Sequence, residues 1–244
     1  MYADLPKEKK IEYLKHLVAH CSLSLLHSSS IKPYLGYREA ENIFCECFDA
    51  ENVSRSDIAI DAIYNSIGIG IKTFTDQSDF QKIAEFDKKS RYHDMFDDLE
   101  IVREVSRMRN KRLDFVYSKY DLSNLIYHCI VRIDGAIRIY EYPMDYIDVD
   151  SIKYVSRTGN TLNFTDGKNR YKFMISKSTI SMHFGLNNPL EEVPVKIMSD
   201  AMDNIVELYD NFSETTVYRL STKDMLQMIR NFDDPAGILV NRKA

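Results

Sequence analysis

The fold is decided by the stretch Ser54-Arg-Ser-Asp-Ile-Ala-Ile-Asp-Ala-Ile-Tyr-Asn-Ser-Ile-Gly-Ile-Gly-Ile-Lys-Thr-Phe74. Two short runs, in which isoleucine alternates with polar or small residues, flank Asn65 and Ser66. A period of two is typical of a half-buried strand, and Asn and Ser suit a tight turn. The sequence therefore predicts a β-hairpin that turns at Asn65 and Ser66.

Folding this hairpin brings three ionisable side chains onto one face. The first run places Asp57 and Asp61 opposite its isoleucines, and the second run places Lys72 on the matching face together with two glycines. In the predicted register Asp61 lies opposite Gly70, and Lys72 lies opposite Ala59. Glycines in a strand leave room for another group to approach the backbone.

Two carboxylates and an ammonium beside glycines point to chemistry on a phosphate. Carboxylate oxygens suit a hard cation such as Mg²⁺. A nearby ammonium can orient an attacking water or stabilise charge on a phosphate oxygen. The alternative interpretation is the exposed face of an ordinary hairpin, in which Lys72 pairs with an aspartate. Spacing alone leaves both interpretations open.

The order of a strand aspartate, a hairpin and a strand lysine resembles the PD-(D/E)XK nuclease core of many type II restriction endonucleases. That core normally carries an acid two residues before the lysine, where this chain has Gly70. Some restriction enzymes of this fold take the acid from the following helix instead. Glu85 lies 13 residues after Lys72, in Gln81-Lys-Ile-Ala-Glu-Phe86, which reads as the start of a helix. The resemblance covers about residues 38–90.

The resemblance implies a Mg²⁺-dependent endonuclease of the restriction type that hydrolyses phosphodiester bonds in double-stranded DNA. In such an enzyme Asp61 and Glu85 hold the metal, and Asp57 or Glu41 completes or supports its shell. Lys72 positions the nucleophilic water. Enzymes that cut palindromic sites usually act as symmetric dimers, so a homodimer is expected.

Glu41 comes from a predicted helix over residues 37–48, with Glu39 as the next choice, because the nuclease core commonly supplies a glutamate from the preceding helix. The alternative role for both is a solvated helix face. The densest basic segment is the predicted helix over 94–113. The expected DNA contacts are Arg55, Gln81, Arg103, Arg107 and Lys177.

Two rival functions stay open. A nuclease of the same fold in repair or another anti-phage role would use the same residues. A catalytically degenerate DNA-binding or protein-binding module is the second rival, and Gly70 at the usual acid position favours it.

The composition fits a globular protein without a membrane span. The chain has 244 residues, 44% hydrophobic and 28% charged, and no apolar run or signal-peptide core stands out. A net charge of −5 argues against a protein that coats nucleic acid without specificity. Four cysteines without zinc spacing predict reduced thiols in the cytoplasm.

The predicted fold is α/β (α+β), a restriction-endonuclease-like core with a central mixed sheet flanked by helices. The nuclease core spans 1–122, with a first helix over 6–27. Residues 123–188 form an antiparallel β segment with Asp-Gly turns, suited to DNA recognition, dimerisation or scaffolding. Residues 189–244 form a C-terminal α/β part. Its predicted elements are helices over 197–209 and 222–232 and strands over 217–220 and 237–240.

Overall fold

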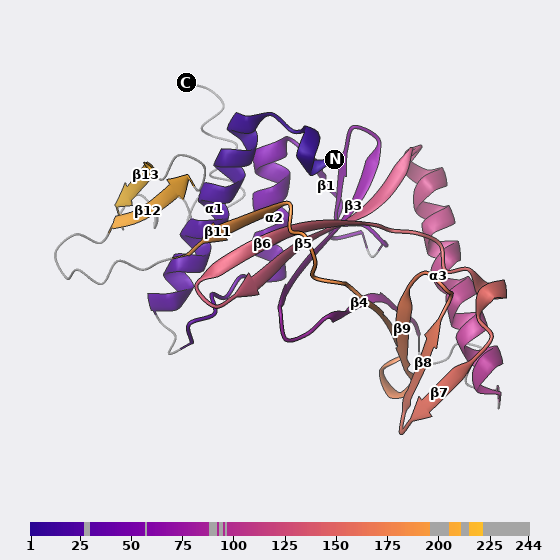
Figure 1. Cartoon of the computed structure of the whole chain (residues 1–244). Helices are drawn as coiled ribbons and strands as arrows, with labels where there is room; N and C mark the ends of the chain where they lie inside the picture. The colour runs from indigo at the N-terminus through magenta and orange to yellow at the C-terminus, as the bar shows by residue number, and fades with distance from the viewer. Residues whose placement is uncertain are drawn as a thin grey trace.

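The computed structural model of this protein describes residues 1–26, 30–56, 58–87, 92, 95, 97–195, 205–210 and 215–221. They form an α+β fold with one mixed sheet, one antiparallel sheet and three α-helices, together with a separate β-hairpin (Figure 1). The helices are α1 (Lys7–Leu26), α2 (Tyr37–Phe48) and α3 (Asp98–Tyr120), with short 3₁₀ turns η1 (Tyr2–Asp4), η3 (Val149–Ser151) and η4 (Ile175–Lys177).

The first sheet has six strands in the order β1-β2-β3-β5-β6-β11. The strands are β1 (Glu51–Asn52), β2 (Ala62–Tyr64), β3 (Ile67–Thr75), β5 (Asn124–Ile133), β6 (Ala136–Pro143) and β11 (Glu191–Pro194). All neighbouring pairs are antiparallel except β3 and β5, which run parallel. A parallel pair needs a crossover, and α3 lies within the connection between these two strands.

The second sheet has five strands in the order β4-β10-β9-β8-β7, all antiparallel. The strands are β4 (Phe80–Glu85), β7 (Val155–Thr158), β8 (Thr161–Thr165), β9 (Arg170–Met174) and β10 (Thr179–His183). Among the residues that the structure describes, strands β12 (Ile205–Asp210) and β13 (Thr215–Ser221) pair only with each other. Strands from both sides of residue 122 share each of the two larger sheets.

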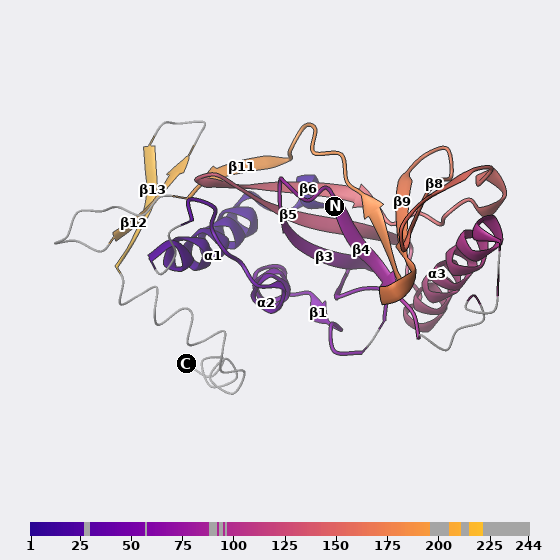
Figure 2. The same ribbon diagram turned by 90° about the horizontal axis from the view of Figure 1, so that it is seen from below.

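Two hydrophobic clusters lie on opposite faces of the six-stranded sheet. On one face, Ile69 and Ile71 of β3 pack with buried side chains of α1 and α2. On the other face, Phe74 belongs to a cluster that also contains α3 and the inner side of the five-stranded sheet. Figure 2 shows α1 and α2 on one side of β3 and β5, and α3 near the five-stranded sheet. Strand β3 is therefore covered on both faces.

A buried polar group fixes α1 against the sheet. His128 of β5 is fully buried, and its Nε2 lies 2.9 Å from the Tyr13 hydroxyl of α1. Its Nδ1 lies 3.5 Å from the Glu141 carboxylate on β6, which also accepts a hydrogen bond from the Tyr2 amide at 2.9 Å. Burial without such partners would be costly for an imidazole and a carboxylate. The group therefore helps to set the packing of α1 against β5.

Most predicted elements are confirmed. The hairpin turns at Asn65 and Ser66, whose φ angles of 47° and 60° are left-handed. The helices predicted over 6–27, 37–48 and 94–113 are present as α1, α2 and α3, although α3 begins and ends later than predicted. The β segment is antiparallel with a turn at Gly135, and the predicted strand over 217–220 lies within β13. The four cysteines are free and buried. No helix in the described part of the chain is long and apolar enough to cross a membrane.

Two predicted helices are wrong. Residues 81–86 were expected to start a helix, but they lie in and just after strand β4, which pairs with β10. Helix-forming residues take the strand conformation here because a sheet edge is available, so tertiary pairing overrides local propensity. Residues 205–209 of the expected helix over 197–209 lie in β12. The elements expected over 222–232 and 237–240 lie outside the described residues.

The close packing over β3 gives a stability prediction. A Cβ added at Gly68 would lie 2.5 Å from a methyl group of Leu125 and 2.8 Å from one of Leu122. Gly68→Ala is therefore expected to lower the free energy of unfolding by about 1–3 kcal/mol through overpacking. Urea denaturation measures the loss. Gly185→Ala is the matched control, because its added Cβ meets nothing closer than 4.0 Å. Equal stability of the two variants would contradict this packing.

Candidate active site

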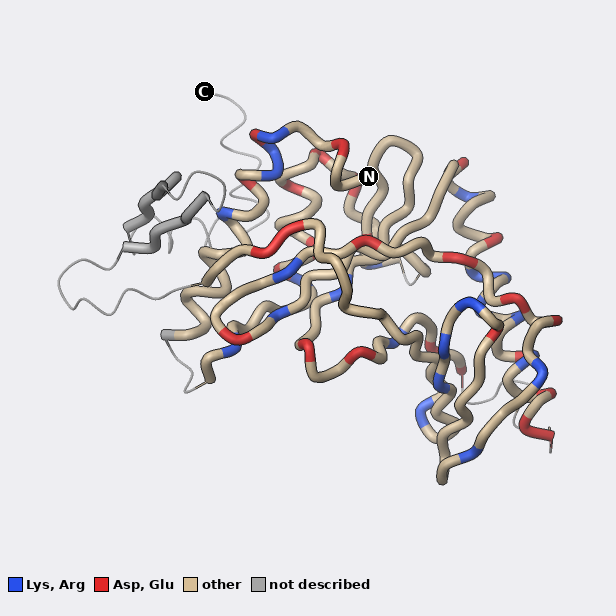
Figure 3. Tube along the Cα trace, viewed as in Figure 1, with Lys and Arg blue, Asp and Glu red and all other residues tan. Residues whose placement is uncertain are grey.

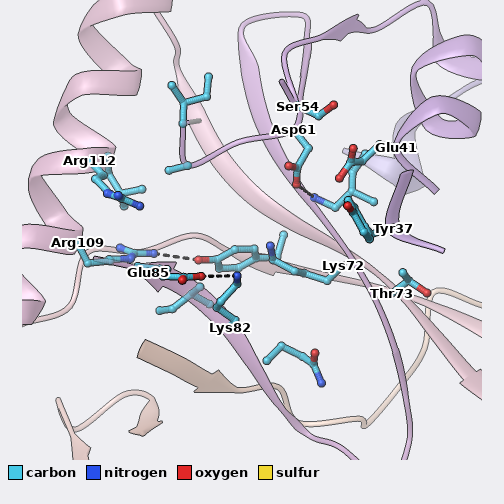
Figure 4. Close-up of a pocket in the computed structure, with 18 of the residues that line it drawn as sticks. Tyr37, Glu41, Ser54, Asp61, Lys72, Thr73, Lys82, Glu85, Arg109 and Arg112 are labelled. Carbon is cyan, nitrogen blue, oxygen red and sulfur yellow. Dashed lines mark hydrogen bonds and ion pairs between the residues drawn. The ribbon is translucent and has the colours of Figure 1, made fainter. Parts of the chain in front are cut away.

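A pocket of about 710 Å³ lies between the two sheets and α3. Strand β3 contributes Lys72, the edge strand β4 contributes Lys82 and Glu85, and α3 contributes Arg109 and Arg112. Helix α2 and the segment before β2 complete the wall with Tyr37, Arg38, Glu41, Ser54 and Asp61. Figure 4 shows these side chains, apart from that of Arg38, around the pocket.

Asp61 is held at the start of the hairpin by the backbone of β3. Its main-chain amide donates to the Ile69 carbonyl at 2.8 Å, and its carboxylate Oδ2 accepts from the Ile71 amide at 2.7 Å. The Asp61 side chain therefore accepts a hydrogen bond from β3 as a neighbouring strand would, one residue before β2 begins. Ala62 pairs with Ile69, which agrees with the predicted position of Asp61 beside Gly70.

Glu41 lies beside Asp61 on the same side of the pocket (Figure 4). Only 5% of Glu41 is exposed, and Arg38 Nη1 lies 3.3 Å from its carboxylate. Burial raises the pKa of Glu41, and the negative charge of Asp61 raises it further. Burial also raises the pKa of Asp61, against the lowering effects of the Lys72 charge and the Ile71 amide. Two desolvated carboxylates thus share one small region.

Lys72 of β3 brings a positive charge near Asp61. It is partly buried, and its Nζ lies 6.0 Å from the centre of the Tyr127 ring. Alternation along β3 gives Lys72 the same face as Gly68 and Gly70. A Cβ at Gly70 would lie 2.8 Å from Met144 and 3.1 Å from Tyr127. Gly70 lies at the position where the PD-(D/E)XK core carries an acid. The space for a side chain at this position is therefore already filled by its neighbours.

Glu85 occupies a different place from the one predicted. It lies on strand β4, forms an ion pair of 2.8 Å with Lys82, and is more than half exposed. Figure 4 shows it across the pocket from Asp61 and Glu41, next to Arg109. The pocket therefore includes Glu85, but not beside the other two carboxylates. Asp57 lies outside the described residues.

Of the five predicted DNA contacts, Gln81 lines the pocket and the other four do not. Gln81 lines the pocket and hydrogen-bonds to Ser78. Arg103 donates to the Ile152 carbonyl at 2.9 Å, and exposed Arg107 pairs with Glu104 at 3.4 Å. Neither of these two arginines lines the pocket. The remaining two contacts, Arg55 and Lys177, are exposed.

Two basic residues of the pocket wall, Arg109 and Arg112, come from the same helix as Arg103 and Arg107. Arg109 is 2% exposed, donates to the Tyr127 hydroxyl at 3.2 Å and also donates to the Asp145 carbonyl. The Arg112 guanidinium lies 5.5 Å from the centre of the Phe86 ring. Their spacing of three residues places them on one face of α3. Arg103 and Arg107 were predicted as DNA contacts instead of this pair, because helical periodicity does not show which face of α3 meets the pocket.

Asp61 and Glu41 are the side chains of the pocket that could hold a divalent cation together. Among the residues that the structure describes, no three of His, Cys, Asp and Glu are grouped to enclose a metal ion. Mg²⁺ does not require such an enclosure, since it is commonly bound by one or two carboxylates, waters and substrate phosphates. Asp61 and Glu41 are two adjacent carboxylates whose ionisation is opposed by burial. A cation would relieve that opposition.

Comparison with protein-family models, with curated proteins and with solved structures gives no match. The function of this chain must therefore be judged from the chemistry of the pocket.

The raised pKa of Asp61 gives a pH prediction. Its folded-state pKa lies above its ordinary value, so ionisation costs folding stability at neutral pH, and the cost disappears as pH falls through that raised pKa. Asp61→Asn is expected to melt at a higher temperature than the wild type at neutral pH in metal-free buffer, with the gain shrinking toward acidic pH. Thermal melts across this range measure the difference.

Asp148→Asn is the control of opposite sign. Hydrogen bonds from Ser151 lower the pKa of Asp148, so this variant is expected to lose stability at neutral pH and to approach the wild type in acid. A lower melting temperature for Asp61→Asn at neutral pH would show that burial of Asp61 carries no such cost.

Proposed function

We propose that this protein is a Mg²⁺-dependent endonuclease of the restriction type, which hydrolyses phosphodiester bonds in double-stranded DNA. The observation that carries the proposal is the meeting of Glu41, Asp61 and Lys72 in one pocket whose opposite wall carries basic side chains. A buried acid and a partly buried acid near a lysine are costly for folding alone, and perturbed carboxylates in a pocket are typical of functional sites.

In this proposal Asp61 and Glu41 would hold the cation, with Arg38 moving away from Glu41 or contributing to phosphate binding. When bound, Mg²⁺ would supply charge stabilisation on the phosphate and at the leaving oxygen. Lys72 lies within the electrostatic reach of Asp61 and orients the attacking water with its ammonium. Glu85 belongs to the opposite wall, where it holds Lys82 in place.

The basic wall gives the pocket its preference for a phosphodiester. Arg109 is fixed by Tyr127 and by the Asp145 carbonyl, and Arg112 stands one turn further along α3. A fixed guanidinium is well suited to phosphate oxygens because its donors form a planar fork. A backbone phosphate between this wall and Lys72 would be contacted from both sides. Two such centres in a symmetric homodimer would cut both strands of a palindromic site.

A second candidate function is a DNA-binding module that has lost catalysis. The filled position at Gly70 and the ion pair of Glu85 with Lys82 favour it, because they leave two carboxylates near Lys72. Binding of DNA without cleavage in Mg²⁺ would select this function. A repair or other anti-phage nuclease differs in its products, since a site-specific enzyme gives discrete fragments from plasmid DNA.

The cleavage test compares Lys72→Ala with the wild type on plasmid and phage-genome DNA, in Mg²⁺ and in EDTA. Loss of the ammonium that orients the water is expected to lower the cleavage rate by about 10²–10³-fold, while binding in EDTA is retained. Lys119→Ala is the control, because Lys119 is exposed on α3 and does not line the pocket. Absence of Mg²⁺-dependent cleavage by the wild type would refute the proposal.

The metal test measures melting temperature during a Mg²⁺ titration. A ligand that binds only the folded state stabilises it, by about 2.7 kcal/mol at one hundred times its Kd. The wild type is expected to gain stability with Mg²⁺, whereas Asp61→Asn and Glu41→Gln are expected to gain much less. Glu85→Gln should respond as the wild type does. An equal response of all four proteins would contradict the proposed Mg²⁺ site at Asp61 and Glu41.

A further inference from the structure

The part of the five-stranded sheet that is formed by β7, β8, β9 and β10 is strongly basic in a chain that is acidic overall. Residues 152–184 contain six Lys or Arg side chains and one acidic side chain, whereas the whole chain has a net charge of −5. The single acid, Asp166, is buried and accepts hydrogen bonds from the amides of Lys168 and Asn169. Figure 3 shows Lys and Arg recurring along this sheet.

One face of this sheet is covered and the other is open. Tyr171 and Phe173 of β9 are buried in the cluster that contains α3. Arg170 and Lys172 alternate with them and therefore point to the opposite face. On that face Lys172 lies opposite Ser181 of β10, and His183 lies opposite Phe80 of β4. None of these outward side chains is buried.

The outward charges are held by an aromatic ring. Lys172 Nζ lies 3.8 Å from the centre of the Phe80 ring, and the Arg170 guanidinium lies 6.0 Å from it. Arg170 also lies 2.6 Å from His183, which in turn pairs with Asp79. Within the described residues, no carboxylate lies within ion-pair distance of Arg170 or Lys172. Their charge is therefore largely available to an external anion.

This face reaches from the candidate active site to a second hollow. Its edge strand β4 carries Lys82, which lines the main pocket. At the far side, a pocket of about 250 Å³ is lined by Arg170, His183, Lys168 and Asn169, together with apolar atoms of Tyr142 and Met182. The strands from β4 to β9 span about 10 Å at the usual strand spacing, which exceeds the interval between successive charges on a DNA strand.

We infer that the open face of β4, β10 and β9, here named the β4–β9 face, is a second contact surface for the DNA backbone. Arg170 and Lys172 bind phosphates that flank the phosphodiester in the main pocket, and Phe80 holds the two cations in position. This inference deepens the proposed function and rests on it for the identity of the polyanion. Phosphate contacts of this kind add affinity and fix orientation without reading sequence.

The experiment measures binding of a fluorescent DNA duplex in EDTA, so that cleavage cannot intervene, over a series of salt concentrations. Each lost phosphate contact reduces the slope of log K against log salt by about 0.9, so Arg170→Gln/Lys172→Gln is expected to reduce it by about 1.8 and to bind more weakly. Lys111→Gln/Lys119→Gln removes the same net charge from exposed positions of α3 and is expected to keep the wild-type slope.

Arg170→Lys/Lys172→Arg keeps both charges and is expected to retain the slope, which separates loss of charge from damage to the sheet. An unchanged slope and affinity in the Gln double variant would overturn the inference that the β4–β9 face contacts DNA. An equal loss in the α3 control would overturn it as well. Wild-type protein that does not bind the duplex also overturns it. DNA bound through this face without Mg²⁺-dependent cleavage sustains the inference and refutes the nuclease proposal alone.

Discussion

The parallel pairing of β3 with β5 is the constraint on which the rest of the structure depends. Nine consecutive residues of β3, Ile67–Thr75, pair with Asn124–Arg132. Because β3 is also covered by hydrophobic clusters on both faces, it can neither slide nor rotate without exposing one of them. Lys72 is thereby fixed in direction, and Asp61 is fixed to the same strand by its bond to the Ile71 amide.

The candidate site concentrates groups that folding alone would not favour. Glu41 and Asp61 are desolvated and repel each other, and their pKa values are raised. Lys72 and Arg38 offset part of this cost, but a guanidinium 3.3 Å from Glu41 gives only one ion pair for two acids. Natural proteins tend to keep such conflicts where a ligand resolves them. The proposed cation and phosphate would each resolve one part of the conflict.

The sequence predicted local structure better than spatial arrangement. The hairpin at Asn65-Ser66 followed from alternation and turn chemistry, and the structure confirms it. Glu85 was assigned to a helix because Gln, Lys, Ala and Glu favour helices, and only the pairing with β10 reveals a strand. Arg103 and Arg107 were chosen over Arg109 because one-dimensional periodicity does not show which face of a helix meets a pocket.

The pocket lies between two sheets, since Asp61 and Glu41 lie beside β3, whereas Lys82 and Glu85 belong to β4. A molecule that contacts Asp61 and Lys82 together would bridge the two sheets. Binding in the pocket would therefore also stiffen the packing of one sheet against the other.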